Sequence, residues 1–202
     1  MKYEFIRKSV HTFSIIIPLS YRYIFDYNKN ISIIVFGIMA LIAIVVEFIR
    51  FKKHSIKLLF NEIFGFLLRD HEFSNLTGAT YLLTSSLLCI AIFPADIAFI
   101  SISFLSIGDT VAALIGIRFG KRKIIFTKKS LEGSIACFVC CFIFSVIFLD
   151  NLDLTTYGIW VISLFGALAA TIAESSKVYL DDNIKIPIFS ALVMTIVYLV
   201  SY

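Results

Sequence analysis

The sequence GDTVAALIGIRFGKRKIIFTKKSLEGS, residues 108–134, joins the end of one long apolar run to the start of the next. Asp109 lies inside the first run, and Ala112, Gly116 and Gly120 follow at four-residue spacing, which places them on one face of a helix. Six cations are grouped in the same stretch: Arg118, Lys121, Arg122, Lys123, Lys128 and Lys129. An ionisable group inside a membrane segment is costly and is usually functional, so this stretch is predicted to carry the chemistry.

Two interpretations of this pattern are open. Small residues at four-residue spacing let transmembrane helices pack closely, and a basic loop can mark only the cytoplasmic side of a membrane. Alternatively, a carboxylate, glycines that admit a ligand to the backbone and adjacent cations form a site for a metal ion and a polyphosphate. The position of Asp109 favours the second interpretation.

The composition predicts a polytopic membrane protein. The 202 residues are 59% hydrophobic, and the mean hydropathy is +0.94. We expect an all-α bundle of about seven transmembrane helices in one domain, residues 1–202. The predicted spans are 10–25, 31–49, 77–94, 97–117, 131–149, 157–174 and 187–202. Segment 55–70 has apolar residues at helical spacing between charged ones, which predicts an amphipathic helix at the membrane interface.

The positive charges predict the orientation. With a cytoplasmic N-terminus, sixteen of the eighteen Lys and Arg residues fall in cytoplasmic segments, and only Arg22 and Lys29 fall outside. Orientation therefore explains the net charge of +4 better than a nucleic-acid partner does. The apolar N-terminal segment lacks a cleavage site and is expected to be a retained first helix. The four cysteines lie in apolar segments and are expected to be packing thiols.

Several short motifs together resemble one enzyme family. GDTVAALIGIRFG and KKSLEGS are accompanied by RKSVH at 7–11, TGATY at 77–81, and Glu174 followed by DDNIKIP at 181–187. This order is similar to that of the CTP-dependent lipid kinases, which include dolichol kinase, phytol kinase and the yeast-type diacylglycerol kinase and are related to phosphatidate cytidylyltransferases. The resemblance covers nearly the whole chain.

The resemblance implies transfer of the γ-phosphoryl group of CTP to the hydroxyl group of a membrane lipid, with Mg²⁺. Asp109 and Asp182 are then the expected metal ligands. The residues expected to bind the nucleotide are Lys129, Lys128, Arg122, Gly116, Gly120, Gly133 and Ser130, with Asn183 either contacting the nucleotide or capping its turn. Three groups remain open as the base that orients or deprotonates the lipid hydroxyl: Glu132, Glu174 and His11.

Two other functions are weighed against this one. In a phosphatidate cytidylyltransferase, a lipid phosphate attacks the α-phosphorus of CTP and pyrophosphate leaves. The longer acidic signature associated with those enzymes, several aspartates close together, is missing from this sequence. A small transporter or lipid-binding membrane protein would use Asp109 and Glu174 without a nucleotide. The acceptor lipid stays open between polyprenol, phytol, a shorter isoprenoid alcohol and diacylglycerol, with the compact chain favouring an isoprenoid alcohol by analogy. The membrane would be the plasma membrane in a bacterium, and the sequence indicates no oligomeric state.

Overall fold

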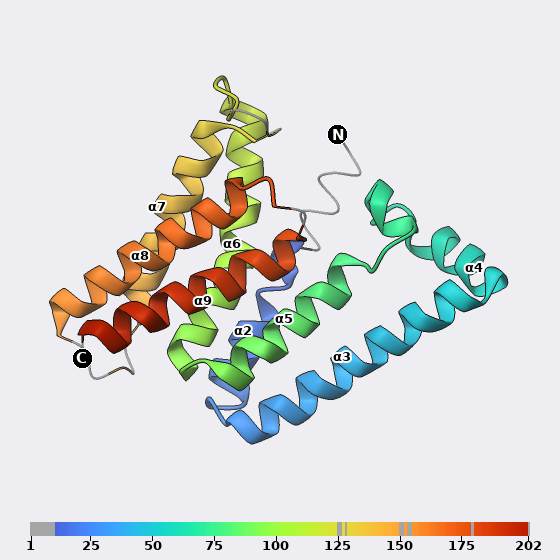
Figure 1. Cartoon of the computed structure of the whole chain (residues 1–202), viewed down its shortest axis with the longest axis horizontal. Coiled ribbons are helices and arrows are strands. Elements are labelled where there is room, and N and C mark those ends of the chain that lie inside the picture. The colour runs from blue at the N-terminus through green and yellow to red at the C-terminus, as the bar shows by residue number, and fades with distance from the viewer. Residues whose placement is uncertain are drawn as a thin grey trace.

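The computed structural model describes residues 11–124, 127, 129–149, 152, 155–178 and 180–201. Within these residues the chain is helical, and its one extended pairing is an isolated bridge between Lys123 and Ser130. The helices are α2 (Ile16–Leu19), the π-helix η1 (Ser20–Ile24), α3 (Lys29–Lys52), α4 (His54–Phe64), the 3₁₀-helix η2 (Asp70–Phe73), α5 (Gly78–Ile92), α6 (Ala95–Phe119), α7 (Leu131–Phe148), α8 (Thr156–Ser175) and α9 (Asp182–Ser201). Figure 1 shows them as a bundle, which confirms the all-α prediction.

The number of spans differs from the predicted seven. Among the described residues, five helices are long and apolar enough to cross a membrane: α3, α6, α7, α8 and α9. Helix α5 has only 15 residues, and the span predicted at 10–25 is divided between α2 and the π-helix η1. The prediction of a membrane helix bundle is therefore confirmed, while the count of seven is not.

Helix α6 lies at the centre of the bundle (Figure 1) and packs against α7, α9 and α2. Of its most apolar 18-residue stretch, 78% is buried, compared with 22% for α3. Serines at 101, 103 and 106 are buried along α6, and their hydroxyl groups form hydrogen bonds with neighbouring groups. Ser103, for example, donates to Phe99 O at 2.8 Å. Helix α6 therefore lies inside, and the more apolar α3 presents its side chains outward, as expected for a bundle surrounded by lipid.

Small residues bring α6 and α7 into close contact. A Cβ atom added at Gly133 would lie 2.5 Å from Ala112 O, and one added at Gly116 would lie 2.9 Å from Ser130 Oγ. A Cβ at Gly108 would lie 2.8 Å from the sulfur of Cys141, which is buried. The small-residue pattern of the sequence therefore does pack helices, and the cysteine takes part in that packing.

Helix α9 begins five residues earlier than predicted. Asp181 accepts a hydrogen bond from the backbone N–H of Asn183 at 2.9 Å and so caps the first turn, which puts Pro187 inside the helix. Proline has no N–H to donate to the carbonyl of Asn183 four residues before it. That carbonyl instead accepts the hydroxyl of Ser85 at 2.6 Å, which ties α9 to α5.

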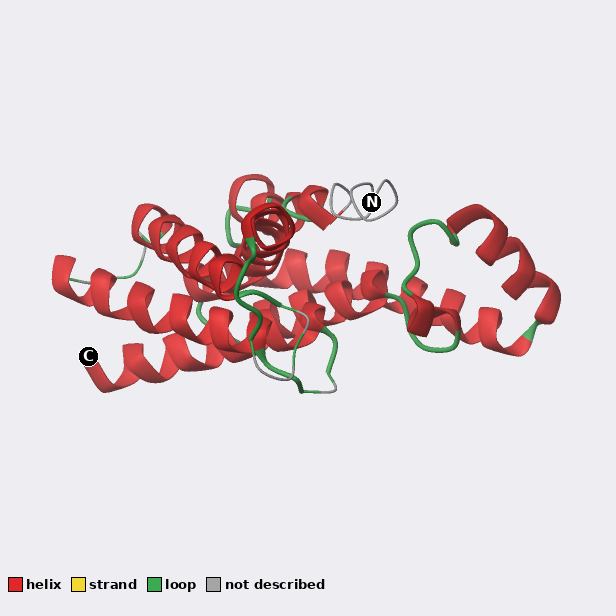
Figure 2. Cartoon of the chain, turned by 90° about the horizontal axis from the view of Figure 1, so that it is seen from above, coloured by secondary structure: helices red, strands yellow, loops and turns green. Residues whose placement is uncertain are grey.

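The predicted amphipathic helix is present but shorter than segment 55–70. Helix α4 ends at Phe64, has no buried residue, and exposes Leu58, Leu59 and Ile63. It lies at one end of the long axis of the molecule, away from α7 and α8 (Figures 1 and 2). Its exposed apolar side chains suit a helix lying at a membrane interface.

Candidate active site

Two cavities open among the helix ends at one side of the bundle. The chain passes up and down in turn, so the C-terminal ends of α3, α6 and α8 meet the N-terminal ends of α5, α7 and α9 there. One cavity, of about 460 Å³, is bordered by charged residues and glycines, and we call it the polar cavity. The other, of about 390 Å³, is mostly apolar, and we call it the apolar cavity. Arg69 and Asp109 line both.

Ion pairs between three helix ends form one wall of the polar cavity. Lys129 Nζ lies 2.9 Å from Glu174 Oε1 and 3.2 Å from Asp182 Oδ2, and it also donates to the backbone carbonyl of Glu174. Lys185 Nζ lies 2.9 Å from the other oxygen of Asp182. The start of α7 is therefore tied to the end of α8 and the start of α9.

Lys129 keeps its positive charge in this setting. Burial alone lowers the pKa of its ammonium group, but Asp182, Glu174 and the more distant Asp109 together raise it more, so the pKa lies above its ordinary value. A half-buried lysine that stays charged can neutralise a phosphate if a ligand replaces one of its carboxylate partners.

The N-terminus of α7 borders the polar cavity, which Ser130, Gly133 and Ser134 line. Ser130 caps this helix, because its hydroxyl oxygen accepts the N–H of Gly133 at 3.2 Å. The loop before it is closed by hydrogen bonds from Ile124 N to Lys129 O and from Leu131 N to Arg122 O, both 2.9 Å. The segment thus presents a helix N-terminus and Lys129 together, which is an arrangement that favours anions.

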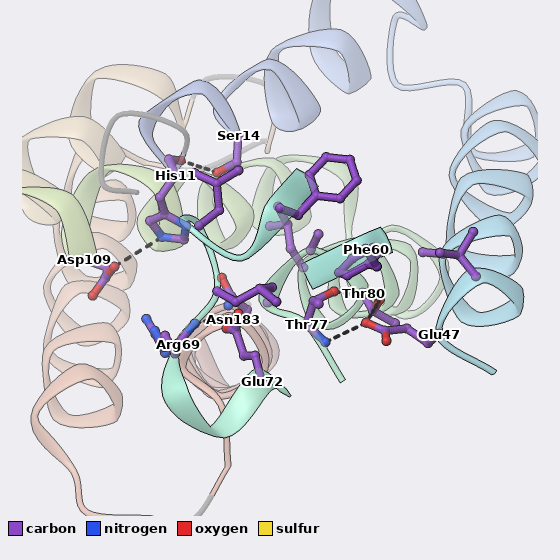
Figure 3. Close-up of a pocket in the computed structure, with 18 residues that line it drawn as sticks. His11, Ser14, Glu47, Phe60, Arg69, Glu72, Thr77, Thr80, Asp109 and Asn183 are labelled. Carbon is purple, nitrogen blue, oxygen red and sulfur yellow. Dashed lines mark hydrogen bonds and ion pairs between the residues drawn. The ribbon is translucent and has the colours of Figure 1, made fainter. Parts of the chain in front are cut away.

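The apolar cavity lies between α3, α4 and α5 and extends to α6 (Figure 3). Its apolar wall includes Ala43 and Val46 of α3, Phe60 and Phe64 of α4, and Leu82 of α5. Its polar end carries His11 and Asp109, whose closest atoms, Nε2 and Oδ2, are 3.3 Å apart. Figure 3 shows this pair at the end opposite Glu47 and Phe60. The cavity can therefore hold a hydrocarbon chain with a polar group at the His11 end.

A buried ion pair stabilises the far side of the apolar cavity. Arg50 Nη2 lies 2.6 Å from Glu47 Oε2, and both side chains are almost fully buried. Arg50 also donates to the carbonyls of Glu72 at 3.1 Å and Asn75 at 2.6 Å, while Glu47 Oε1 accepts the N–H of Thr77 at 2.8 Å. Helix α3 therefore fixes the backbone that connects η2 to α5.

The structure distributes the predicted site residues unevenly. The polar cavity is lined by eight of them: Asp109, Gly116, Gly120, Lys129, Ser130, Gly133, Glu174 and Asp182. The apolar cavity is lined by His11, Asp109 and Asn183. Arg122 and Glu132 line neither cavity, and the Glu132 carboxylate accepts the backbone N–H of Arg122 at 3.2 Å. Lys128 lies outside the described residues.

Three contributions to the site were given no role in the sequence prediction: Arg69, which lines both cavities, Lys123, and the pair Glu47–Arg50. Lys123 belongs to the basic stretch that the sequence does single out. A glutamate and an arginine at i and i+3 near the end of the most apolar helix were a signal for a buried pair, because unpaired charges are rare there.

The carboxylates of the polar cavity fit a divalent cation. Asp109, Glu174 and Asp182 all line it, and Glu174 Oε2 is buried without a hydrogen-bond partner among the described residues. These three residues do not form a preformed metal cluster. Among the described residues, the potential ligand atoms that lie within 4.8 Å of one another belong to His71, Glu72 and Asp181. Mg²⁺ is usually held by one or two carboxylates together with substrate phosphates, so a preformed cage is not required.

Comparison with known proteins places the chain in a family. Residues 2–175 match the Cytidylyltransferase family. The chain is 30% identical to "CTP-dependent diacylglycerol kinase 1" of Schizosaccharomyces pombe, over 97% of this chain and 94% of that protein, and 26% identical to the Saccharomyces cerevisiae protein of the same name, over 97% and 74%. It is 33% identical to "Probable phytol kinase 2, chloroplastic" of Glycine max, over 63% and 47%. No solved structure matches. The predicted family is confirmed: the chain belongs to the cytidylyltransferase family, together with CTP-dependent lipid kinases.

Proposed function

We propose that this protein transfers the γ-phosphoryl group of CTP to the hydroxyl group of a membrane lipid alcohol. The observation that carries the proposal is the meeting of a charged cavity and an apolar cavity at Asp109 and Arg69. A triphosphate suits the first cavity and a lipid suits the second. Phosphoryl transfer needs the attacking oxygen and the leaving oxygen in line with the phosphorus, and it needs the negative charge of the phosphates neutralised. Both conditions can be met at the junction between the cavities.

The nucleotide side is assigned to the polar cavity. Lys129, next to the positive end of the α7 dipole, would receive phosphate oxygens, with Gly116, Gly120 and Gly133 leaving the backbone accessible. Asp109 and Asp182 would hold Mg²⁺ together with phosphate oxygens, and the ion when bound would neutralise charge on the triphosphate. The ammonium group of Lys129 is paired with two carboxylates, so binding of the nucleotide would exchange an internal ion pair for one with phosphate.

The acceptor side is assigned to the apolar cavity. Of the three candidate bases, His11 lines this cavity, Glu174 is paired with Lys129 in the polar cavity, and Glu132 lines neither. We therefore assign His11 to take the proton of the lipid hydroxyl. The hydroxyl oxygen forms the new bond to the γ-phosphorus, the bond from that phosphorus to the bridging oxygen breaks, and CDP leaves.

Diacylglycerol is the first acceptor to test. Two relatives that match over 97% of the chain are named diacylglycerol kinases, whereas the plant protein named phytol kinase matches over 63% of it. The sequence comparison thus favours a glycerolipid over the isoprenoid alcohol that the compact chain favoured by analogy. We further propose that both cavities face the cytoplasm, because the cations crowd at this side of the bundle.

The test uses purified protein in detergent with Mg²⁺, a panel of lipid alcohols and phosphatidic acid, and CTP labelled in parallel at the γ-phosphate or the cytosine. Entry of γ-label into a lipid alcohol is the expected result and identifies the acceptor. Entry of cytosine label into phosphatidic acid would instead make the protein a cytidylyltransferase. If neither label enters any lipid, the enzyme assignment fails and a carrier function gains support.

Asp109→Asn is the matching variant. The substitution keeps the shape of the side chain and removes its charge, so it should abolish γ-label transfer while leaving the melting temperature near that of the wild type. Turnover within tenfold of the wild type would remove Asp109 from the metal-binding role.

A further inference from the structure

We propose that Arg69 is a catalytic residue that contacts the γ-phosphoryl group of the nucleotide as it passes to the acceptor. This inference rests on the proposed function and adds a residue to it. Arg69 lies in the connection between α4 and η2, outside the motifs that carry the family resemblance.

The first argument is position. Arg69 and Asp109 line both cavities, so a group that moves from the polar cavity to the apolar one passes between them. Figure 3 shows the nitrogen atoms of Arg69 on the side of the apolar cavity where Asp109 lies, with Glu72 and Asn183 beside the arginine. A guanidinium at this point faces the nucleotide and the acceptor at once.

The second argument is that the protein leaves donors of Arg69 available. A guanidinium carries five N–H groups, yet the contacts in the described structure give it one hydrogen bond, to Asp181 Oδ2 at 3.5 Å, which is long. The other oxygen of Asp181 already accepts two N–H groups of Asn183, at 2.9 and 2.6 Å. A purely structural arginine would normally be bound more closely, often by both nitrogens of its fork.

The third argument is that Arg69 is held in place. Its backbone N–H donates to Glu72 Oε2 at 3.2 Å, and the carbonyl of Glu72 is in turn fixed by Arg50 of α3 at 3.1 Å. The buried pair Glu47–Arg50 thus anchors the segment that presents Arg69. The backbone from which the guanidinium extends therefore needs no rearrangement during the step, which lowers the cost of bringing its donors to developing charge.

The fourth argument is charge. Burial lowers the pKa of the Arg69 guanidinium, but the carboxylates of Asp181, Asp109 and Asp182 raise it more, so it stays cationic at any working pH. Its planar fork matches two phosphoryl oxygens, which a lysine ammonium does not. In the transfer, the oxygens of the γ-phosphoryl group would receive these N–H donors while the bridging-oxygen bond breaks and the bond to the lipid oxygen forms.

The test compares Arg69→Ala and Arg69→Lys with Lys52→Ala, a control at an exposed cation of α3 that lines neither cavity. Transfer of γ-label from CTP to the acceptor used by the wild type is measured over both substrate concentrations. We expect Arg69→Ala to lower kcat by about 10²- to 10³-fold with little change in either KM, and Lys52→Ala to leave both parameters within twofold. Added guanidinium ion should restore part of the turnover of Arg69→Ala and none of that of Asp109→Asn.

Arg69→Lys keeps the charge next to Asp181 and covers the case in which Arg69→Ala does not fold. It should melt near the wild-type temperature and still lose at least about tenfold in kcat, since the fork is lost. A wild-type kcat in either folded variant, or a raised KM for CTP with unchanged kcat, would overturn the catalytic role of Arg69. If the wild type itself transfers no γ-label, the proposed function fails, and this inference fails with it.

Discussion

Gly133 tests whether the contact between α6 and α7 is as close as the structure shows. Replacement by alanine would place a Cβ atom 2.5 Å from Ala112 O, 3.1 Å from Ser130 Oγ and 3.3 Å from Gly116 Cα. The nearest of these atoms belongs to the backbone of α6, which cannot rotate away as a flexible side chain can. Gly133→Ala therefore has to separate the two helices.

The expected loss follows from the size of the clash. Inserting one carbon into a well-packed region costs about 1–3 kcal/mol. For a chain of this length each kcal/mol corresponds to about 2–4 °C in melting temperature, so Gly133→Ala should melt about 2–12 °C below the wild type. The gain in helix propensity from glycine to alanine, about 1 kcal/mol, acts in the opposite direction and places the result toward the lower part of that range.

The assay is thermal unfolding in detergent, with Gly37→Ala as the control. A Cβ atom at Gly37 of α3 would meet only Leu87 Cδ1, at the ordinary distance of 4.0 Å. Gly37→Ala should therefore keep or slightly raise the melting temperature, since alanine favours the helix. Equal melting temperatures for Gly133→Ala and Gly37→Ala would refute the close packing of α6 on α7.

The same variant separates two roles of Gly133. This residue also lines the polar cavity and donates its N–H to Ser130, so movement of α7 should raise KM for CTP. A lower melting temperature with unchanged CTP kinetics would leave Gly133 a packing residue and remove it from nucleotide binding.

Three further results are expected. Ser85→Ala leaves the carbonyl of Asn183 without its donor and should lower the free energy of unfolding by about 1–3 kcal/mol, measured as a lower melting temperature. The control Ser86→Ala removes a buried hydroxyl that has no partner in the described structure, so its melting temperature should be unchanged or higher. Lys129→Met should lower the melting temperature by the same amount at pH 6 and at pH 9. The pKa of Lys129 is raised on folding, so its charge stabilises the folded state fully below the unfolded pKa of about 10.4 and is lost only at higher pH. A difference in melting temperature that vanishes by pH 9 would contradict the raised pKa. Arg50→Ala leaves Glu47 buried and unpaired and should lower stability by about 3–5 kcal/mol, while an unchanged melting temperature would show that this pair does not hold α3 to the segment before α5.

The geometry also bears on the rival functions. A carrier would be expected to connect its ionisable groups to the opposite face, where Arg22 lies. Arg22 instead donates to the carbonyl of Phe148 at 2.8 Å and sits over the ring of Phe99 at 4.9 Å. It is thus part of the packing at that end, which agrees with an enzyme whose charged groups serve one face.

The prediction of individual elements was limited where distant residues decide the outcome. The start of α9 was missed because Pro187 is tolerated in the helix only when another group satisfies the carbonyl of Asn183, and that group is Ser85, nearly a hundred residues earlier. The amphipathic helix was predicted too long because the helical spacing continues past Phe64, where the chain turns toward η2.

The sequence by itself determined the class of the protein, its apolar helices, the charged side of the bundle and the family. Hydrophobic transfer, helical periodicity and charge asymmetry are properties of local sequence, and the motifs can be recognised in order along the chain. Only the tertiary structure decided which residues meet. It brought Lys129 to Glu174 and Asp182, put Glu132 outside both cavities, and placed Arg69 beside Asp109 where the cavities join. Such meetings depend on how helix ends pack across long separations in sequence, and no local pattern encodes those distances.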